Sequence, residues 1–600
     1  MLRITEIKLP LISSAETGHT GAEIKAALVK KLAINAADIV SFSIFKRGVD
    51  ARKSHAILFV YSLDVLVNGE AKLLAKHAKD PHIKPTPDTN YQFVAYANSI
   101  KNNASNNNEN VIAQANQGGE ARATQIVHKV QQGASNETNA ELPRKCHSYR
   151  PVIVGFGPAG IFAALILAQA GFKPIVLERG KAVRERTKDT FNFWRKSELN
   201  AESNVQFGEG GAGTFSDGKL WSQIKDPKHY GRKVLQEFVA AGAPPEILYV
   251  SHPHIGTFRL VGMVETMRKT IENLGGEIRF ESRVDDIEIG LDSKNRSEVQ
   301  AVVLKSGERI ATNHLVLAVG HSARDTFEMI YKKGIFVEAK PFSIGFRIEH
   351  PQSLIDKARY GNSYSEDLLS KLGSAEYKLV HHASNGRSVY SFCMCPGGTV
   401  VASASEAGCV VTNGMSQYSR NERNANAGIV VGITPEQDYP ADSSEYGPLA
   451  GMQLQRQLEA KAYALGGNTY AAPGQLIGDF LANKASVKFG EVLPSYTPGV
   501  HLTNLNTALP EFAIDAIREA IPEFAKQVKG YDLADGILTG VETRTSSPIR
   551  IKRDDETLQS INTKGLYPCG EGAGYAGGIL SAGVDGIKVA EAVALSLVTQ

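Results

Sequence analysis

The chain has 600 residues, of which 42% are hydrophobic and 22% are charged, as is usual for a globular protein with a sizeable core. With 66 Lys and Arg against 63 Asp and Glu, the net charge of +3 gives no electrostatic reason to expect nucleic acid or an anionic membrane as the main partner. Five cysteines exclude a disulfide framework, and together with an N-terminus unlike a signal peptide they predict a soluble cytoplasmic protein.

Residues 1–96 are predicted to form a small α+β domain. Strand-like alternation at 2–9, helical apolar spacing at 21–32 and strand-like segments at 40–47 and 55–67 give the order β-α-β-β. The domain is mildly basic. A solvated face explains this charge, and a docking surface for an acidic protein partner or RNA is the alternative.

Residues 97–147 are predicted to be a disordered linker. This stretch has no aromatic residue, and ten Asn and five Gln fall between Asn98 and Asn139. Such a composition cannot bury enough apolar surface to offset the entropy lost on ordering.

A dinucleotide-binding motif follows in PVIVGFGPAGIFAALILAQAGFKPIVLERG (151–180). A β-branched strand runs into Gly-x-Gly-x-x-Gly, an apolar helix follows, and a second strand ends at an acidic residue placed to accept hydrogen bonds from a ribose. The first glycine permits the tight turn, the second lets the backbone approach a pyrophosphate, and the third lets helix and strand pack closely. The predicted cofactor contacts here are Gly155, Gly157, Pro158, Ala159, Gly160 and Glu178.

A second glycine cluster at 208–213 matches the same pattern, but neither a buried strand nor an apolar helix flanks it. It is therefore not a second Rossmann turn. No cysteine lies between Cys146 and Cys393, so the redox CxxxxC of disulfide reductases is absent as well. The chain is predicted to hold one dinucleotide domain, and any NAD(P)H would dock transiently as an electron donor.

The C-terminal segment GLYPCGEGAGYAGGILSAGVDGIKVAEAV (565–593) favours FAD over NAD. It resembles the return segment of glutathione-reductase-type flavoproteins, in which an acidic residue holds the ribityl and phosphate region and a helix N-terminus faces the flavin. Helix-end N–H groups would stabilise the negative charge of a reduced flavin. The residues assigned to this role are Gly570, Glu571, Gly577, Gly578 and Ile579.

Several motifs together resemble the NAD(FAD)-utilising dehydrogenase family, also called FAD-dependent dehydrogenases. They are FGEGGAGTFSDGKL (207–220), HPHIGTFRL (252–260), LAVGHSARD (317–325), SFCMCPGG (391–398), VVTNGMS (410–416), GVETRTSSP (540–548) and YPCGEGAGYAGGI (567–579). The resemblance implies FAD binding, oxidoreductase chemistry and a small N-terminal α+β domain, but no substrate. By position it adds cofactor contacts at Arg179, Gly180, Gly210, Gly211, Gly213, Thr214, Val284 and Gly320.

The predicted fold class is α/β: a Rossmann-type, glutathione-reductase-like FAD-binding domain with an inserted mixed, β-rich substrate domain, and the small N-terminal α+β domain. The FAD-binding domain is expected at 148–335 and again at 536–600, around a substrate or cap domain at 336–535. The three glycine-rich segments also account for most of the excess of glycine, which numbers 56 against about 42 expected at average usage.

Cys393 and Cys395 are the first candidates for chemistry. They fall in a strand-like segment, where residues two apart share a face and have Cα atoms about 6.6 Å apart. A stable bridge would then need a bend at Pro396-Gly397. Packing within a sheet and a redox or thiolate role beside the flavin both remain open.

Three further residues are catalytic candidates. Lys219 follows the second glycine cluster and is a candidate for a contact near flavin N5 or O4. His321 is a candidate acid or base, and Arg544 could bind a carboxylate or phosphate of the substrate. No metal site is predicted, because the pair His252 and His254 has no matched further ligands.

The predicted function is FAD-dependent oxidoreduction, with hydride or electron transfer between the flavin and an unidentified small molecule. One alternative is a flavin-dependent tRNA-modifying enzyme, in line with the basic N-terminal domain. The other is a non-enzymatic, FAD-binding assembly protein that uses that domain for contact.

Overall fold

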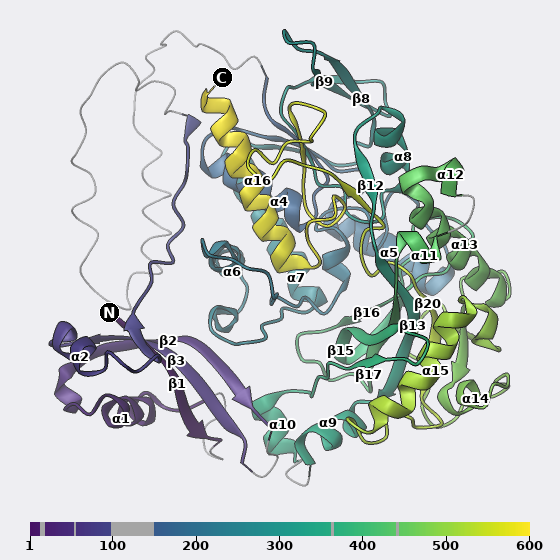
Figure 1. Cartoon of the computed structure of the whole chain (residues 1–600). Helices are drawn as coiled ribbons and strands as arrows, with labels where there is room; N and C mark the ends of the chain where they lie inside the picture. The colour runs from purple at the N-terminus through teal and green to yellow at the C-terminus, as the bar shows by residue number, and fades with distance from the viewer. Residues whose placement is uncertain (12–17, 53–55, 98–148, 362–364, 440–442, 600) are drawn as a thin grey trace.

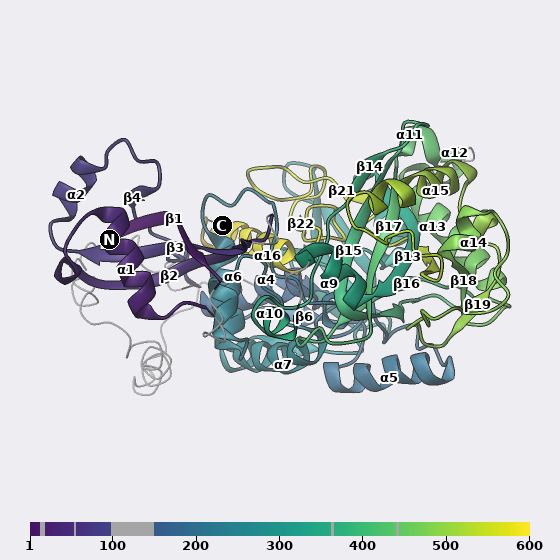
Figure 2. The same ribbon diagram turned by 90° about the horizontal axis from the view of Figure 1, so that it is seen from below.

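Strands and helices alternate along much of the chain, and three regions follow one another across the molecule (Figures 1 and 2). The N-terminal module lies on one side, a parallel sheet with its helices lies in the middle, and a large mixed sheet lies on the other side. The computed structural model describes residues 1–11, 18–52, 56–97, 149–361, 365–439 and 443–599. The predicted linker therefore lies, except for residue 97, outside the described residues.

The N-terminal module is a four-stranded sheet with one long helix against it. Its strands run in the order β2-β3-β1-β4, and the helix buries Ile24, Leu28 and Leu32 against the sheet. Its strands and long helix follow one another in the order β-α-β-β, and a short helix and a fourth strand come after them. The elements are β1 (Leu2–Pro10), α1 (Gly21–Leu32), β2 (Ile39–Asp50), β3 (Leu58–Val67), α2 (Glu70–Lys76) and β4 (Ile83–Pro85).

Backbone hydrogen bonds join this module to the central region. The amide of Arg47 on β2 donates to the carbonyl of Tyr249 at 2.6 Å, and the amide of Ser251 donates to the carbonyl of Arg47 at 2.9 Å. Farther on, Tyr91 and Phe93 pack against the central core. The module is thus attached to the central region through β2 and through the residues after β4, and Ile57 also packs into the core of the large mixed sheet.

The central sheet is parallel, with strand order β22-β11-β5-β6-β7. In β5, β6, β11 and β22 every residue is buried, so these strands are covered on both faces, as expected for a parallel sheet packed between helices. α4 and α16 pack side by side next to it (Figure 1), which explains why α4 is buried almost all round. The elements are β5 (Val152–Val154), α4 (Pro158–Gln169), β6 (Ile175–Leu177), β7 (Glu277–Arg279), β11 (Leu315–Leu317), β22 (Leu566–Pro568) and α16 (Ile579–Thr599).

Two smaller sheets border the central one. The antiparallel sheet β10-β9-β8 follows β7 in the chain, and β12 pairs with β21. The strands are β8 (Val284–Leu291), β9 (Ser297–Leu304), β10 (Arg309–Ala311), β12 (Val337–Ala339) and β21 (Ile549–Ile551).

The large mixed sheet has the strand order β14-β15-β17-β13-β20-β18-β19, with β16 paired to β15. β20 opens the segment that was expected to return to the FAD-binding part, yet it lies inside this sheet between β13 and β18. The sheet therefore extends past residue 535. The strands are β13 (Phe342–Pro351), β14 (Val380–His382), β15 (Ser388–Ala402), β16 (Thr412–Ser416), β17 (Asn424–Ile433), β18 (Ala472–Leu476), β19 (Val500–Leu502) and β20 (Ile537–Glu542).

The remaining helices connect and cover these sheets. Apolar residues of the large sheet form one continuous core with α13 and α15. These helices are α5 (Val183–Lys196), α6 (Tyr230–Ala240), α7 (Thr257–Asn273), α8 (Arg324–Lys332), α9 (Gln352–Tyr360), α10 (Glu366–Leu372), α11 (Pro435–Asp438), α12 (Ser443–Tyr446), α13 (Ala450–Leu465), α14 (Ile477–Leu481) and α15 (Glu511–Ala525).

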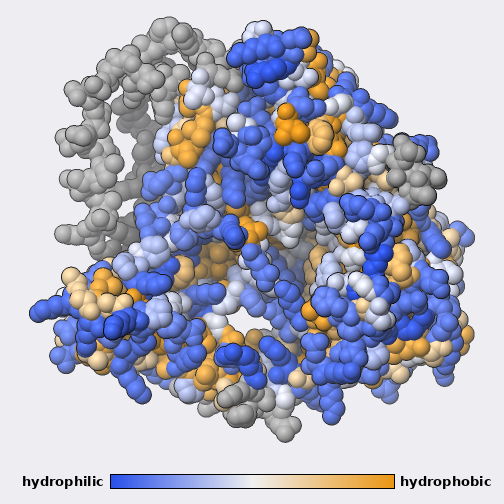
Figure 3. Space-filling model, viewed as in Figure 1, coloured by the Kyte–Doolittle hydropathy of each residue, from blue (hydrophilic) through white to orange (hydrophobic). Residues whose placement is uncertain are grey.

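The surface agrees with the ordinary composition. Figure 3 shows a largely hydrophilic face on which hydrophobic residues occur in small, separate groups. Within the described part of the chain, no helix combines the length and the apolar character that crossing a bilayer requires.

Candidate functional site

One cavity of about 360 Å³ lies where β5, β6, β11 and β22 end, between the central region and the large mixed sheet. Val154, Leu177, Ala318 and Cys569, each at or just after the carboxyl end of one of these strands, all line it. Ligands of open α/β sheets bind at this edge, because the loops that follow the strands meet there. The volume falls within the range of small-molecule and cofactor sites.

Two glycine loops meet at this cavity. Gly155 has φ of +97°, and a Cβ there would lie 2.4 Å from the carbonyl oxygen of Ala318, so the turn requires glycine. Gly211 has φ of +59°, and its Cβ would lie 2.9 Å from the Cα of Gly157. The predicted glycine turn and the second glycine cluster therefore lie against each other, with the N-terminus of α4 beside them.

Glu178 connects the turns of both glycine loops. One carboxylate oxygen accepts the amide of Phe156 at 2.8 Å, and the other accepts the amides of Gly180 and Gly208, each at 2.9 Å. A carboxylate offers about four acceptor positions. Since three are used, the cavity-lining carboxylate keeps room for about one more donor, such as a ribose hydroxyl.

Arg186 on α5 holds the second loop from behind. Its fully buried guanidinium donates to the carbonyls of Asn204, Val205 and Glu209 at 2.7 to 2.8 Å and to that of Gly208 at 3.3 Å. Burial lowers its pKa to about 10, so it stays charged at neutral pH. The sequence patterns did not single out this residue, since its acceptors, the four carbonyls and the hydroxyl of Thr214, become neighbours only in the folded loop.

The C-terminal segment supplies the opposite wall. Gly577, Gly578 and Ile579 line the cavity where α16 begins, and a Cβ added at either glycine would meet nothing within 4 Å. The N-termini of α4 and α16 thus both border one cavity, and each brings partial positive charge and N–H donors. Burial raises the pKa of Glu571, which also lines the wall, to about 7, against the opposing effect of Lys340.

Most of the cofactor contacts predicted from the sequence line this cavity. Of the predicted cofactor contacts, the lining includes Gly155, Gly157, Pro158, Ala159, Glu178, Arg179, Gly211, Gly213, Val284, Gly320, Glu571, Gly577, Gly578 and Ile579. Five others are not part of the lining. Gly570 packs toward Ala159 and Gly180 packs toward Gly208, whereas Gly160 and Gly210 pack within their own turns. The five residues are Gly160, Gly180, Gly210, Thr214 and Gly570.

Cys393 lines the cavity, whereas Cys395 is buried and does not. Both cysteines lie in a strand, β15, as expected, but this strand is irregular at the pair. β15 shifts register between Phe392 and Cys395, and Cys393 has φ of +41°. The thiol of Cys395 lies 3.4 Å from the carbonyl oxygen of Cys393, toward which it donates.

Lys219 also lines the cavity, and its Nζ donates to the carbonyl of Met394, between the two cysteines. Its neighbour Asp217 is buried and forms an ion pair with Arg420. Although burial opposes it, this ion pair lowers the pKa of Asp217. Lys219 is therefore the cation of this loop that faces the cavity and the cysteine segment.

His321 lines the cavity, but its environment keeps the imidazole neutral. Burial, together with the charges of Arg544 and Arg324, lowers its pKa to about 3. Its Nδ1 lies 2.9 Å from the hydroxyl of Ser322. A proton-carrying role at neutral pH, for which His321 was a candidate, is disfavoured by this setting.

Arg544 reaches the cavity wall, but much of its hydrogen-bonding capacity is taken. Its Nε and Nη2 donate to the carboxylate of Glu459 at 3.1 and 2.9 Å, and Nη1 donates to Ser405 at 2.7 Å. Arg324 donates to the same carboxylate from the other side. Arg544 therefore belongs to a buried ion cluster, and only its remaining N–H groups are available to a substrate.

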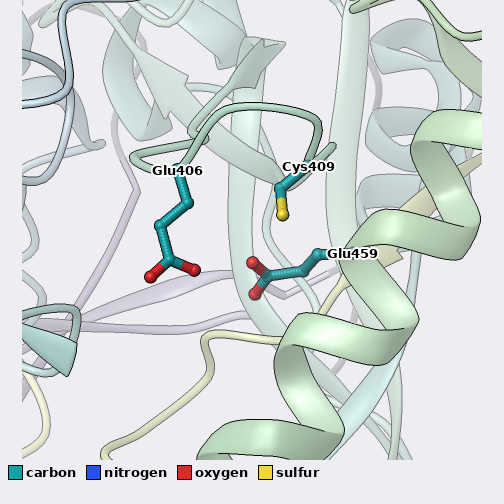
Figure 4. A group of neighbouring side chains, drawn as sticks. All are labelled: Glu406, Cys409 and Glu459. Carbon is teal, nitrogen blue, oxygen red and sulfur yellow. The ribbon is translucent and has the colours of Figure 1, made fainter. Parts of the chain in front are cut away.

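Glu406, Cys409 and Glu459 point toward one another from the loop after β15 and from α13 (Figure 4). Their ligand atoms lie within 4.8 Å of one another. However, Arg324 pairs with both carboxylates, Arg456 pairs with Glu406, and burial raises the pKa of Cys409 to about 11. The arginines already neutralise this group, so its chemistry does not suit a metal ion.

Other lining residues were missed by the sequence patterns. Gln206 accepts a hydrogen bond from Ser322 and donates to Ser403, which joins the second glycine loop to the end of β11 and to the large sheet. Trp221 lies stacked on His252 with ring centroids 4.6 Å apart. Gln206 and Trp221 lie directly before and after the glycine motif at 207–220. Their partners lie 31 to 197 residues away in the chain, and contacts over such distances leave no periodic pattern in the sequence.

Comparison with known proteins places this site in a family. An uncharacterized protein of Clostridium beijerinckii is 44% identical over 592 residues, which are 98% of this chain and 98% of that protein. The chain belongs to the family of this clostridial protein. Residues 341–545 match the family described as FAD-dependent protein, C-terminal domain-like, and residues 1–66 match a domain of unknown function, DUF8436.

Solved structures are similar only at a distance. Glycine oxidase from Geobacillus kaustophilus is 11% identical, with 74% of this chain and 94% of that chain covered and a TM-score of 0.30. CtdE in complex with FAD is 12% identical, with 73% and 82% covered and a TM-score of 0.27. Such TM-scores are too low to establish a shared overall fold.

Proposed function

We propose that this protein binds FAD in the cavity and uses it for oxidoreductase chemistry. The observation that carries this proposal is the convergence of the two glycine loops and of the N-termini of α4 and α16 on one cavity. The match of residues 341–545 to a family described as FAD-dependent supports the choice of cofactor. The finer assignment to the NAD(FAD)-utilising dehydrogenases is part of the same proposal and rests on the sequence motifs.

The residues present fit a dinucleotide. Gly157 and Gly211 leave backbone exposed beside the N-terminus of α4, where a pyrophosphate would receive N–H donors. Glu178 retains an acceptor position for a ribose hydroxyl. Gly577 and Gly578, at the N-terminus of α16, leave open the space in which a flavin ring would lie.

FAD supplies hydride or electron transfer when it is bound, and the chain supplies the environment for it. The N-terminus of α16 would stabilise negative charge on the pyrimidine side. The large mixed sheet would exclude water from the reacting face through Phe392, Cys393 and Asn413, which line the cavity from that side. Because the described residues contain one dinucleotide unit, we propose that an electron donor such as NAD(P)H docks transiently.

Flavin content tests the proposal. Purified protein should show flavin absorbance or bind added FAD at one per chain, and Gly211→Ala should lower the affinity at least about tenfold, since its Cβ would push into Gly157. Gly307→Ala is the matched control. It has the same left-handed backbone, with φ of +87°, but nothing within 4 Å of its Cβ, in the turn between β9 and β10. Protein that neither contains nor binds FAD would contradict the proposal.

The same sample separates an enzyme from a flavin-bound assembly protein. An oxidoreductase should be reduced by dithionite and reoxidised by an added acceptor. A bound flavin that cannot be reduced and reoxidised would favour the non-enzymatic alternative.

A further inference from the structure

The pair Cys393 and Cys395 has a geometry that FAD binding alone does not explain. Cys393 lies on the cavity wall, and Cys395 lies directly behind it. The register shift and the left-handed backbone at Cys393 take the segment out of a regular extended strand, in which the two Cα atoms would lie about 6.6 Å apart. At this bulge the thiol of Cys395 lies against Cys393, because it donates toward the Cys393 carbonyl oxygen at 3.4 Å.

Two cations are held beside this pair by hydrogen bonds to its backbone. Arg347, which is fully buried, donates to the carbonyl of Cys393 at 2.9 Å, and Lys219 donates to the carbonyl of Met394. Among the nearby acids, Asp217 is paired with Arg420 and Glu542 is paired with Arg347, while Glu571 also interacts with Cys393. Lys219 is therefore a second cation whose charge favours a negative charge at Cys393.

The two thiols are expected to differ in protonation. The hydrogen bond from Cys395 and the charges of Arg347 and Lys219 lower the pKa of Cys393 in spite of burial. The same contact and burial raise the pKa of Cys395. A thiolate therefore faces the cavity while a protonated thiol lies behind it, which is the division of roles between an attacking and a resolving cysteine.

The other described cysteines differ from Cys393 in protonation, although Cys569 also lines the cavity. Cys409 and Cys569 are buried, and burial raises the pKa of both thiols. They serve as internal references for reactivity in the same protein.

We propose that Cys393 and Cys395 form a thiol–disulfide exchange site, and that the substrate class is a small disulfide that enters the cavity. Only the return of the pair to its reduced state rests on the proposed function. Exchange itself needs no flavin.

The exchange balances in two steps. The Cys393 thiolate attacks one sulfur of the substrate disulfide, so that an S–S bond forms to Cys393 and the first product leaves as a thiolate. Cys395 then gives its proton to the first product thiolate and attacks the sulfur of Cys393, which releases the second product as a thiolate and leaves a Cys393–Cys395 disulfide. Two electrons pass from the cysteine pair to the substrate, and two electrons with one proton, supplied through reduced FAD, restore the thiolate and the thiol.

Ellman's reagent, an aromatic disulfide, tests this site in the reduced full-length protein without oxygen. Wild type should release two product thiolates in a fast phase and leave a disulfide between Cys393 and Cys395, assigned by peptide mass spectrometry. Cys395→Ser should release one product thiolate and keep a mixed disulfide on Cys393. Cys393→Ser should lose the fast phase, with the reaction at least about tenfold slower, whereas Cys409→Ser should behave as wild type.

A fast phase that survives in Cys393→Ser, or a second product thiolate in Cys395→Ser, would overturn the proposal. If Cys393→Ser does not fold, alkylation of wild type by iodoacetamide at mildly acidic pH decides instead: Cys393 must be labelled faster than Cys409 and Cys569, and equal labelling overturns the site. Flavin absorbance is recorded in the same samples. Thiol exchange in protein that binds no flavin would support the exchange site and contradict the proposed cofactor. Bound flavin without thiol exchange would support the cofactor and contradict the exchange site.

Discussion

Replacing Glu459 by Gln should destabilise the protein strongly, because this carboxylate compensates two buried cations. It accepts five hydrogen bonds, four from Arg324 and Arg544 and one from Thr543. The side chains of Arg324, Glu459 and Arg544 are 1%, 0% and 4% exposed, so water cannot replace the lost charge.

The size of the effect follows from that burial. Removing one partner of a buried ion pair costs about 3–5 kcal/mol, which is roughly two to three and a half orders of magnitude in the folding equilibrium. Glu328→Gln is the matched control, because it breaks an ion pair to Arg456 in which the two side chains are 32% and 29% exposed. That change should cost at most about 1 kcal/mol.

Urea unfolding followed by tryptophan fluorescence measures both variants. The pH dependence adds a second readout, since the arginines hold the pKa of Glu459 at about 2 against burial, below its ordinary value of 4.5. The stability supplied by this carboxylate is complete above pH 4.5 and is lost as the pH falls toward 2. The difference between wild type and Glu459→Gln should therefore shrink over that interval. If Glu459→Gln is as stable as Glu328→Gln at neutral pH, the reasoning is refuted.

Three further changes test other parts of the site. Arg186→Lys should weaken FAD binding at least about tenfold and lower the melting temperature, because one ammonium cannot span four carbonyls; titration with FAD measures this, and unchanged affinity would contradict it. His321→Gln should reduce the loss of stability between pH 6.5 and 3, where the unfolded chain binds a proton that the folded imidazole does not; equal acid sensitivity of variant and wild type in urea unfolding would count against it. Gly155→Ala should lower stability by more than about 1 kcal/mol, because the turn has φ of +97° and its Cβ would meet the carbonyl of Ala318; a wild-type melting curve would show that this backbone can relax.

Much of the dinucleotide unit could be predicted, because its constraints lie close together in the chain. The turn at Gly155, the helix from Pro158 and the strand before Glu178 each depend on neighbours a few residues away. The same holds for the N-terminal module, where helical spacing at Ile24, Leu28 and Leu32 matched the buried face. Local propensity and periodicity carry such information.

The catalytic candidates were less predictable, because their properties depend on distant partners. Arg544 appeared free to bind a substrate anion, but Glu459, which lies 85 residues earlier in the chain, accepts two of its hydrogen bonds. His321 appeared suited to proton transfer until the fold placed it near two arginines. Desolvation and charge pairing arise only in the folded protein.

The sequence by itself determined the glycine turns. A position that needs a left-handed backbone, or that another backbone approaches closely, requires glycine, and the spacing of such glycines is visible within a short segment. Only the tertiary structure decided how those turns meet: Gly211 against Gly157, the carbonyls of the second loop around Arg186, and the bulge that presents Cys393 to the cavity. The physical reason is that these contacts join segments tens to hundreds of residues apart, and their energies depend on burial that no local pattern encodes.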